Sequence, residues 1–236
     1  MKALLLAAGE GTRLRPLTEK IPKCLVPING KPLLSIWLDQ LTEAGVTEFL
    51  INTSYLAEQV YDFINTSPHK DKVTLVHEKN LLGTAGTLIH NSAWFDNDAF
   101  LFAHADNLCK VNWSDFFQTH KNRPKQTDLT MMTFDTDTPQ NCGIVSVDKD
   151  GVLKGFFEKV KEPPGTRANA AIYIVEPGFI KLISENDKKI FDFSVEIIPN
   201  HLPQIYTWHN DGYVRDIGTP ESYRLAQDEW LNIHER

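Results

Sequence analysis

The amino-acid sequence predicts an α/β fold: a doubly wound, mixed but mainly parallel sheet with helices on both faces. In the first half of the chain, short apolar runs alternate with segments whose apolar residues recur at helical spacing. Strands that are joined through helices form right-handed crossovers and lie parallel in one sheet. The length of 236 residues is sufficient for one large α/β domain.

The predicted elements of the first half follow one another regularly. We expect strands at 3–7, 48–52, 73–77, 99–103 and 129–134, and helices at 33–44, 56–65 and 84–91.

The second half, from about residue 136, has a more mixed character. The stretch CGIVSVDKDGVLKGFFEK predicts two strands around a turn at Asp150 and Gly151, and a further strand is expected at 169–175. Pro177 is expected to open a short helix. Thr219 and Pro220 are typical of the N-cap and first residue of a terminal helix that reaches Leu231. We expect a single domain over 1–236, with halves of about 1–135 and 136–236.

Composition excludes several classes of function. The formal net charge of −7 argues against a general nucleic-acid binder. The three cysteines lie far apart without a C-x-x-C pair, which suits a reducing cytoplasm and disfavours a disulfide scaffold or a thiolate zinc site. No apolar run reaches the length of a transmembrane helix, so we expect a cytoplasmic protein with no membrane partner.

The first loop, LLLAAGEGTRLRPLTEKIPK, concentrates basic residues in this acidic chain. A strand followed by a glycine-rich turn is a common phosphate site, because glycines let backbone N–H groups converge on an anion. The loop fits neither the P-loop pattern nor the full dinucleotide fingerprint. A tight turn with positive φ at both Gly9 and Gly11 is the structural alternative. Arg13 and Lys23 favour a triphosphate, since fixed cations beside such a turn suit its charge.

The segment from Ala7 to Thr18, with Pro22-Lys23 and the stretch from Pro27 to Pro32, resembles the signature of the sugar-nucleotidyltransferases, the nucleoside-diphosphate-sugar pyrophosphorylases. The resemblance covers nearly the whole chain. Within the family, the sequence most resembles the mannose-1-phosphate guanylyltransferases. It implies a Rossmann-like fold of the nucleotide-diphospho-sugar transferase type, with a nucleotide-binding first half and a sugar-phosphate-binding second half. It also implies a reaction in which a sugar 1-phosphate attacks the α-phosphorus of a nucleoside triphosphate and pyrophosphate leaves.

The resemblance assigns roles in the nucleotide half. Arg13 would hold the β- and γ-phosphates, and Lys23 would lie beside the α-phosphate as a catalytic and substrate-binding residue. Arg15, Lys20 and Lys31 receive no role, because a solvated or structural position explains them equally well. The backbone that would approach the base, ribose and phosphates belongs to Leu6, Ala7, Ala8, Gly9, Gly11, Thr12, Gly83 and Thr84.

Two aspartates are candidate Mg²⁺ ligands and catalytic residues. A triphosphate is normally handled with Mg²⁺, which binds one or two carboxylates together with phosphate oxygens. Asp106 follows the apolar run LFAHA, at the kind of strand end where α/β proteins bind ligands. The family usually has a glycine where this chain has Ala105. Asp216, in VRDIGTP, matches the second metal aspartate of the family.

The resemblance makes Glu78 the candidate for reading the base, because it stands where thymidylyl- and uridylyltransferases commonly have a glutamine. An ionised carboxylate only accepts hydrogen bonds, which suits the paired donors of guanine and favours GTP. The alternative is a carboxylate that merely ends a strand at the surface. On the sugar side, the resemblance assigns substrate contacts to Gly143, Glu158, Lys159 and Asn169. The family often has glycine in place of Ala171, a departure that could narrow the sugar pocket.

Other functions remain open at this point. The expected partners are a nucleoside triphosphate and a sugar 1-phosphate, and the chain is expected to be a monomer or a homo-oligomer. One alternative is a uridylyl- or thymidylyltransferase acting on glucose-, N-acetylhexosamine- or N-acetylmuramate-1-phosphate. A second is a phosphocholine-type cytidylyltransferase, and a third is a non-catalytic regulatory subunit that binds a nucleotide-sugar. The last is disfavoured because the expected basic and acidic residues are all present.

Overall fold

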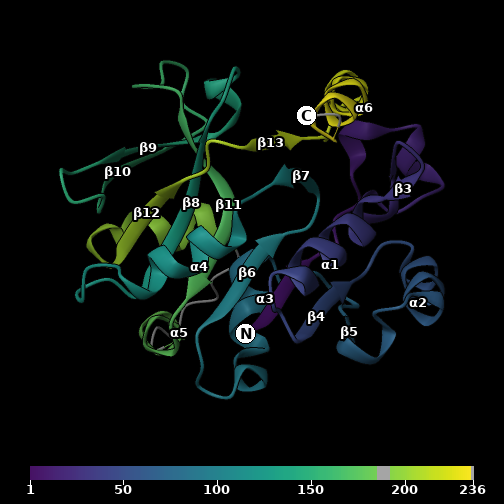
Figure 1. Cartoon of the computed structure of the whole chain (residues 1–236), viewed down its shortest axis with the longest axis horizontal. Helices are drawn as coiled ribbons and strands as arrows, with labels where there is room; N and C mark the ends of the chain where they lie inside the picture. Colours follow the sequence, from purple (N-terminus) through teal and green to yellow (C-terminus); the bar gives the residue numbers. More distant parts are fainter. Residues whose placement is uncertain (185–191, 235–236) are drawn as a thin grey trace. The chain divides into compact units, whose positions relative to one another are not determined.

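The computed structural model describes residues 1–184 and 192–234, which form two compact units (Figure 1). Unit 1 is assembled from three separate segments of the chain, Met1–Leu81, Ala103–Lys110 and Tyr213–Arg236. Unit 2 contains Leu82–Phe102 and Val111–Gly212. The strand β6, Phe100–His104, starts in unit 2 and ends in unit 1.

Unit 1 contains the parallel strands that the sequence predicts. β1 pairs in parallel with β4, and β4 with β5, through crossovers that contain α1 and α2. A short antiparallel pair, β7 with β13, and a hairpin of β2 with β3 complete its strands. The bounds are β1 Lys2–Leu6, β2 Pro27–Ile28, β3 Lys31–Pro32, α1 Leu33–Glu43, β4 Glu48–Thr53, α2 Ala57–Thr66, β5 Val73–His77, β7 Asn107–Lys110, β13 Tyr213–Asp216 and α6 Pro220–His234.

The core of unit 1 follows from the apolar pattern. Ala3, Leu4 and Leu5 of β1 are fully buried, as expected of a strand covered on both faces. The first turn of α6 is capped as predicted, because the Thr219 hydroxyl accepts from the backbone N–H of Ser222 at 3.1 Å.

Unit 2 contains mostly antiparallel strands. β9 and β10 form the predicted hairpin around Asp150 and Gly151, and β11 pairs antiparallel with both β9 and β8. β12 joins β8 in parallel. The bounds are α3 Thr84–His90, α4 Trp113–Lys121, β8 Leu129–Asp135, β9 Gly143–Val147, β10 Leu153–Glu158, β11 Arg167–Val175, α5 Pro177–Ser184 and β12 Ile205–His209.

The predicted fold class, a mixed, mainly parallel sheet with helices, is confirmed. The predicted strands and helices of the first half lie within one or two residues of the observed ones. The sequence did not predict β2, β3, β7, β12, β13 or α4. In the part of the chain that the structure describes, no helix is both long enough and apolar enough to cross a membrane.

Candidate functional site

Four of the predicted catalytic residues meet in unit 1. The Lys23 ammonium donates to Asp106 Oδ2 at 2.9 Å and to Asp216 Oδ1 at 3.3 Å, so it bridges the two carboxylates. Arg13 Nη2 lies 3.4 Å from Asp216 Oδ2. The residues come from the first loop, from the turn between β6 and β7, and from the end of β13. The structure therefore collects two cations and two anions from distant parts of the sequence.

Lys23 is a buried cation whose charge is maintained by its partners. Its side chain is only 7% exposed, whereas those of Asp106 and Asp216 are 39% and 51% exposed. Burial opposes the charge, but the carboxylates of Asp106 and Asp216 outweigh it and raise the pKa of Lys23 above its ordinary value. Burial also works against the charge of Asp106, and Lys23 and His104 nevertheless hold the pKa of that carboxyl below its usual range. Lys23 and Asp106 are consequently both charged at neutral pH.

The glycines around this cluster differ in their backbone conformation and in the space that a side chain would have. Gly11 has φ +62°, and a Cβ there would lie 3.1 Å from the Lys23 Cβ. Gly9 has no positive φ, so the structural alternative of a tight turn with positive φ at both Gly9 and Gly11 is wrong. A Cβ at Gly9 would meet nothing within 4 Å, which leaves open space above that part of the loop. A Cβ at Gly218 would lie 2.8 Å from both Arg13 Nη2 and Asp216 Oδ1, so this glycine, which the sequence reasoning missed, makes room for the cluster.

Glu78 lies at the carboxyl ends of the parallel strands of unit 1. It is 5% exposed, so the alternative of a surface carboxylate is wrong. Its Oε1 accepts from Asn52 Nδ2 at 3.0 Å, and Asn52 Oδ1 accepts from the backbone N–H of Ala7 at 2.8 Å. Asn52, which is 4% exposed, thus links the first loop to Glu78. Sequence reasoning missed Asn52, although a polar residue closing the apolar run FLI was a signal.

Unit 2 brings together most of the residues predicted for the sugar side. Glu158 Oε1 lies 3.2 Å from Lys159 Nζ, and the Lys159 side chain is 67% exposed. Gly143 pairs with Glu158 across the β9–β10 hairpin, and a Cβ there would lie 2.6 Å from Glu158 Oε2 and 2.4 Å from the Phe156 ring. The glycine is therefore required for the position of the Glu158 carboxylate. Elsewhere in unit 2, Gly83 caps α3, and the Thr84 hydroxyl accepts from the backbone N–H of Phe193 at 2.7 Å.

Asn169 and Ala171 lie in a bulge of β11. The register of the β11–β8 pair shifts between Asn169 and Tyr173, and Ala171 adopts φ +56°. Asn169 Oδ1 accepts from the Ala171 N–H at 2.9 Å, and Asn169 Nδ2 donates to the Tyr173 hydroxyl at 2.7 Å. The bulge thus orients Asn169. Because the left-handed region is strained for alanine, a glycine would fit position 171 with less strain.

We expect Ala171→Gly to stabilise the protein by about 0.5–1 kcal/mol, because relief of the left-handed strain exceeds the added backbone entropy of glycine. The change corresponds to a rise of roughly 1–4 °C in the midpoint of thermal unfolding. The control is Ala170→Gly, at a buried position with negative φ, which should lower the midpoint. Equal losses in both variants would contradict a strained backbone at Ala171.

Two of the remaining basic residues, Arg15 and Lys31, have carboxylate partners. Arg15 lies 3.5 Å from Glu10, and Lys31 lies 2.6 Å from Asp39. The Lys20 carbonyl accepts from Gln59 Nε2. These contacts agree with the absence of an assigned role.

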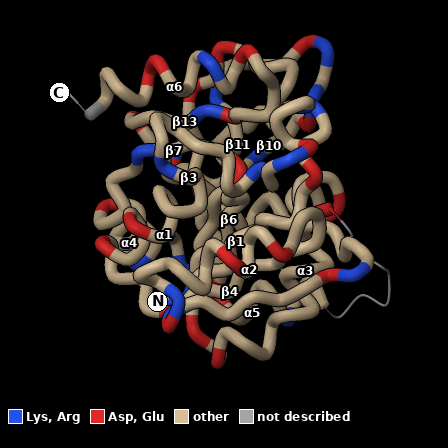
Figure 2. The backbone as a smooth tube through the Cα atoms, turned by 90° about the vertical axis from the view of Figure 1, so that its right-hand side faces the viewer, with Lys and Arg blue, Asp and Glu red and all other residues tan. Residues whose placement is uncertain are grey.

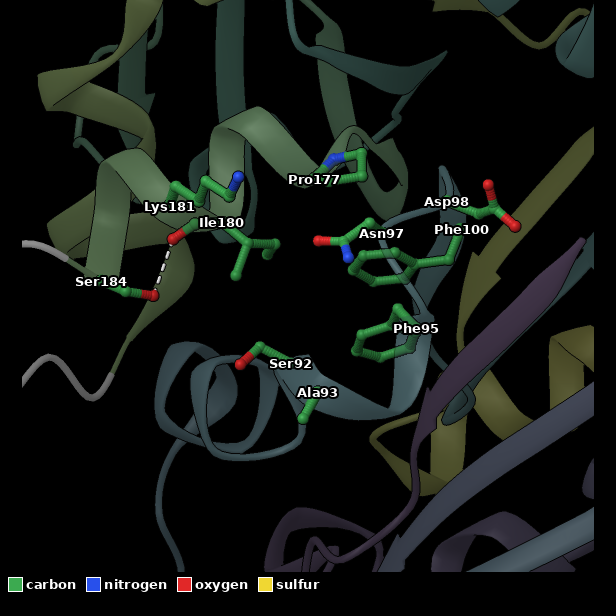
Figure 3. Close-up of a pocket in the computed structure, with 10 residues that line it drawn as sticks. All are labelled: Ser92, Ala93, Phe95, Asn97, Asp98, Phe100, Pro177, Ile180, Lys181 and Ser184. Atoms are coloured by element: carbon green, nitrogen blue, oxygen red, sulfur yellow. Dashed lines mark hydrogen bonds between the residues drawn. The ribbon is translucent and has the colours of Figure 1, made fainter.

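A separate cavity of about 290 Å³ lies in unit 2, between the start of β6 and α5 (Figure 3). The rings of Phe95 and Phe100 stack at 3.6 Å beside it, and Ile180 faces them in the close-up. None of the residues predicted for the site lines this cavity.

In Figure 2, acidic and basic segments are interspersed along the chain in the view shown.

Comparison with known proteins identifies the family. The model of the family described as "Nucleotidyl transferase" matches residues 2–232. The mannose-1-phosphate guanylyltransferase catalytic subunit beta of Drosophila pseudoobscura pseudoobscura is 33% identical over 237 residues, which cover 98% of this chain and 62% of that relative. The chain thus spans less than two thirds of the length of that relative.

Two solved structures are similar throughout. HddC from Yersinia pseudotuberculosis complexed with GMP-PN has a TM-score of 0.81 and 26% identity, covering 97% of this chain and 99% of that chain. A UDP-glucose pyrophosphorylase has a TM-score of 0.82 at 22% identity, covering 98% of each chain, and shows the fold alone. With the family model matching almost from end to end, the chain belongs to the nucleotidyl transferase family of enzymes.

Proposed function

We propose that the protein transfers a nucleotidyl group from a nucleoside triphosphate, with GTP favoured, to a sugar 1-phosphate, mannose 1-phosphate or a related hexose or heptose 1-phosphate. The observation that carries the proposal is the bridge of Lys23 between Asp106 and Asp216, with Arg13 beside Asp216. The two cations of such a cluster can neutralise a polyphosphate, and its two carboxylates can bind a divalent cation. The guanylyltransferase relative and the neighbour complexed with GMP-PN support the same reaction class.

The two aspartates fit the Mg²⁺ that we propose as cofactor. Mg²⁺ takes oxygen ligands, often one or two carboxylates with phosphate oxygens, and Asp106 and Asp216 already gather around one cation, the Lys23 ammonium. Among residues 1–184 and 192–234, no third His, Cys, Asp or Glu joins them as a ready-made metal cluster. When bound, Mg²⁺ would neutralise developing charge on the phosphates.

The chain's own residues would then act by positioning and charge. A phosphate oxygen of the sugar 1-phosphate forms a bond to the α-phosphorus, the bond from that phosphorus to the bridging oxygen breaks, and pyrophosphate leaves. Arg13, whose side chain is 66% exposed, would hold the β- and γ-phosphates and the departing charge. Lys23 would face the α-phosphate. Lys159 would bind the phosphate of the sugar, and Glu158 and Asn169 its hydroxyls.

The preference for GTP rests on Glu78. The residue is 5% exposed and its carboxylate, as an acceptor-only group, would accept from guanine N1–H and N2–H. Uracil and thymine present one donor between two acceptors, and cytosine would use only its amino group. The uridylyl, thymidylyl and cytidylyl alternatives therefore match this residue less well.

A matrix of substrates tests the proposal directly. Purified protein with Mg²⁺ is given each of four nucleoside triphosphates with mannose, glucose, N-acetylhexosamine or heptose 1-phosphate, and pyrophosphate release is measured. We expect release only when both substrates are present, with GTP as the best nucleotide. Absence of turnover throughout the matrix, with nucleotide-sugar still bound, would favour the regulatory-subunit alternative.

Glu78→Gln should move the nucleotide preference from GTP towards UTP or dTTP. The introduced amide replaces an acceptor by a donor, so guanine loses at least one hydrogen bond, and the kcat/KM for GTP should fall by about 10-fold or more relative to that for UTP. Glu43→Gln, on the exposed end of α1, is the matched control. An unchanged GTP:UTP ratio would mean that Glu78 does not contact the base.

A further inference from the structure

Asn52 lies near the end of β4, the strand between β1 and β5 in unit 1. Its side chain is almost fully buried and joins the first loop, at Ala7, to Glu78, at the end of β5. The three residues lie at the carboxyl ends of β1, β4 and β5, which are parallel neighbours. This row of hydrogen bonds is therefore located at the edge of the sheet where α/β proteins bind ligands.

The chemistry of the row fixes the orientation of the Asn52 amide. The backbone N–H of Ala7 can only donate, so the atom that faces it at 2.8 Å must be the carbonyl oxygen of Asn52. The amide nitrogen must then face Glu78 Oε1, at 3.0 Å, where it requires an acceptor. The backbone N–H of Ala7 thus determines, through Asn52, which kind of atom residue 78 has to turn inwards.

We propose that Asn52 is a positioning residue for nucleotide specificity, which sets the hydrogen-bonding polarity that residue 78 presents to the base. The inference rests on the proposed role of Glu78 in base recognition and goes beyond it. A carboxylate at position 78 accepts from Asn52 through Oε1, and because it has several lone pairs and no donor it can only be an acceptor towards the base as well. A glutamine there must turn its oxygen to Asn52, and its amide nitrogen then faces the base as a donor.

The same logic predicts a reversal in a double variant. In Asn52→Asp, the introduced carboxylate accepts from Ala7 but now requires a donor from residue 78. Combined with Glu78→Gln, it draws the amide nitrogen of the introduced glutamine inwards and turns the carbonyl oxygen towards the base. The double variant should therefore present an acceptor again and recover preference for guanine.

The experiment measures the dissociation constants of GTP and UTP by equilibrium dialysis, and their kcat/KM values with one sugar 1-phosphate. The proteins are the wild type, Glu78→Gln, Asn52→Asp and the double variant. We expect Glu78→Gln to lower the GTP:UTP ratio about 10-fold or more, and the double variant to regain at least half of that change on a logarithmic scale. Asn52→Asp alone sets two carboxylates against each other and should weaken the binding of both nucleotides.

Asn65→Asp on the exposed face of α2 controls for the change of charge, and thermal unfolding of every variant controls for loss of fold. If Glu78→Gln lowers the GTP:UTP ratio and the folded double variant does not restore it, the proposed role of Asn52 is overturned, while base reading by Glu78 still stands. No change of ratio in Glu78→Gln would overturn base reading by Glu78, and the inference with it. Because binding is measured independently of turnover, absence of catalysis would refute the proposed reaction without deciding either point.

Discussion

Asp106→Asn is expected to reduce nucleotidyl transfer by about 1,000-fold, in the upper range for the loss of one electrostatic contact to a reacting group. The change removes the charge that Asp106 contributes both to Lys23, at 2.9 Å, and to the proposed Mg²⁺ site. The size of the side chain is kept, so the geometry of the turn between β6 and β7 should persist. Pyrophosphate release at saturating GTP and sugar 1-phosphate measures the effect.

Titration with Mg²⁺ separates the ion pair that Asp106 forms with Lys23 from its proposed role as a metal ligand. If the carboxylate binds the metal, the variant should need a much higher Mg²⁺ concentration for half-maximal rate. Asp71→Asn, which changes an exposed aspartate of the same unit, should behave as the wild type. Wild-type turnover in Asp106→Asn would exclude this residue from the metal site.

The second large effect is expected for Lys23→Met, which keeps much of the apolar stem and deletes the ammonium. Turnover should fall by about 100- to 1,000-fold, because the α-phosphate would lose the cation that we propose to face it and the two carboxylates would repel each other. The removal of a buried partner also costs stability, but the partial exposure of both aspartates screens that loss. Single-turnover kinetics and thermal unfolding, measured together, distinguish loss of chemistry from loss of fold.

Lys72→Met, at an exposed position after α2, is the matched control. A Lys23→Met protein that keeps its rate while its unfolding midpoint falls would assign Lys23 a purely structural role. The inverse result, a folded but inactive variant that still binds GTP, is the one we expect.

The sequence predicted elements whose signal is local. β1, β4 and β5 are apolar runs that need no partner to be recognised, and the Thr219 cap depends on residues three positions apart. β7 and β13 are four residues each and partly polar, and they are stable because they pair with each other across more than 100 positions. Their pairing depends on tertiary structure, which no window of sequence contains.

The candidate site shows the same limit. Arg13, Lys23, Asp106 and Asp216 were found through a resemblance, and the structure adds that they form one connected cluster. Asn52 was missed because its importance lies in two partners, Ala7 and Glu78, that are 45 and 26 residues away. Gly218 was missed for a similar reason, since the atoms that exclude a side chain there include the end of Arg13.

The three-segment composition of unit 1 has a consequence for how the enzyme acquires its activity. Lys23 and Asp216 are 193 residues apart, and Asp106 belongs to the segment between them. Contacts between such distant residues require the closure of a long loop. The entropic cost of this closure makes such contacts slow to form. The cluster can therefore assemble only after β13 has been synthesised and has emerged from the ribosome. Nascent chains that lack β13 should have neither Asp216 nor a competent centre, so unfinished molecules would not consume nucleotide.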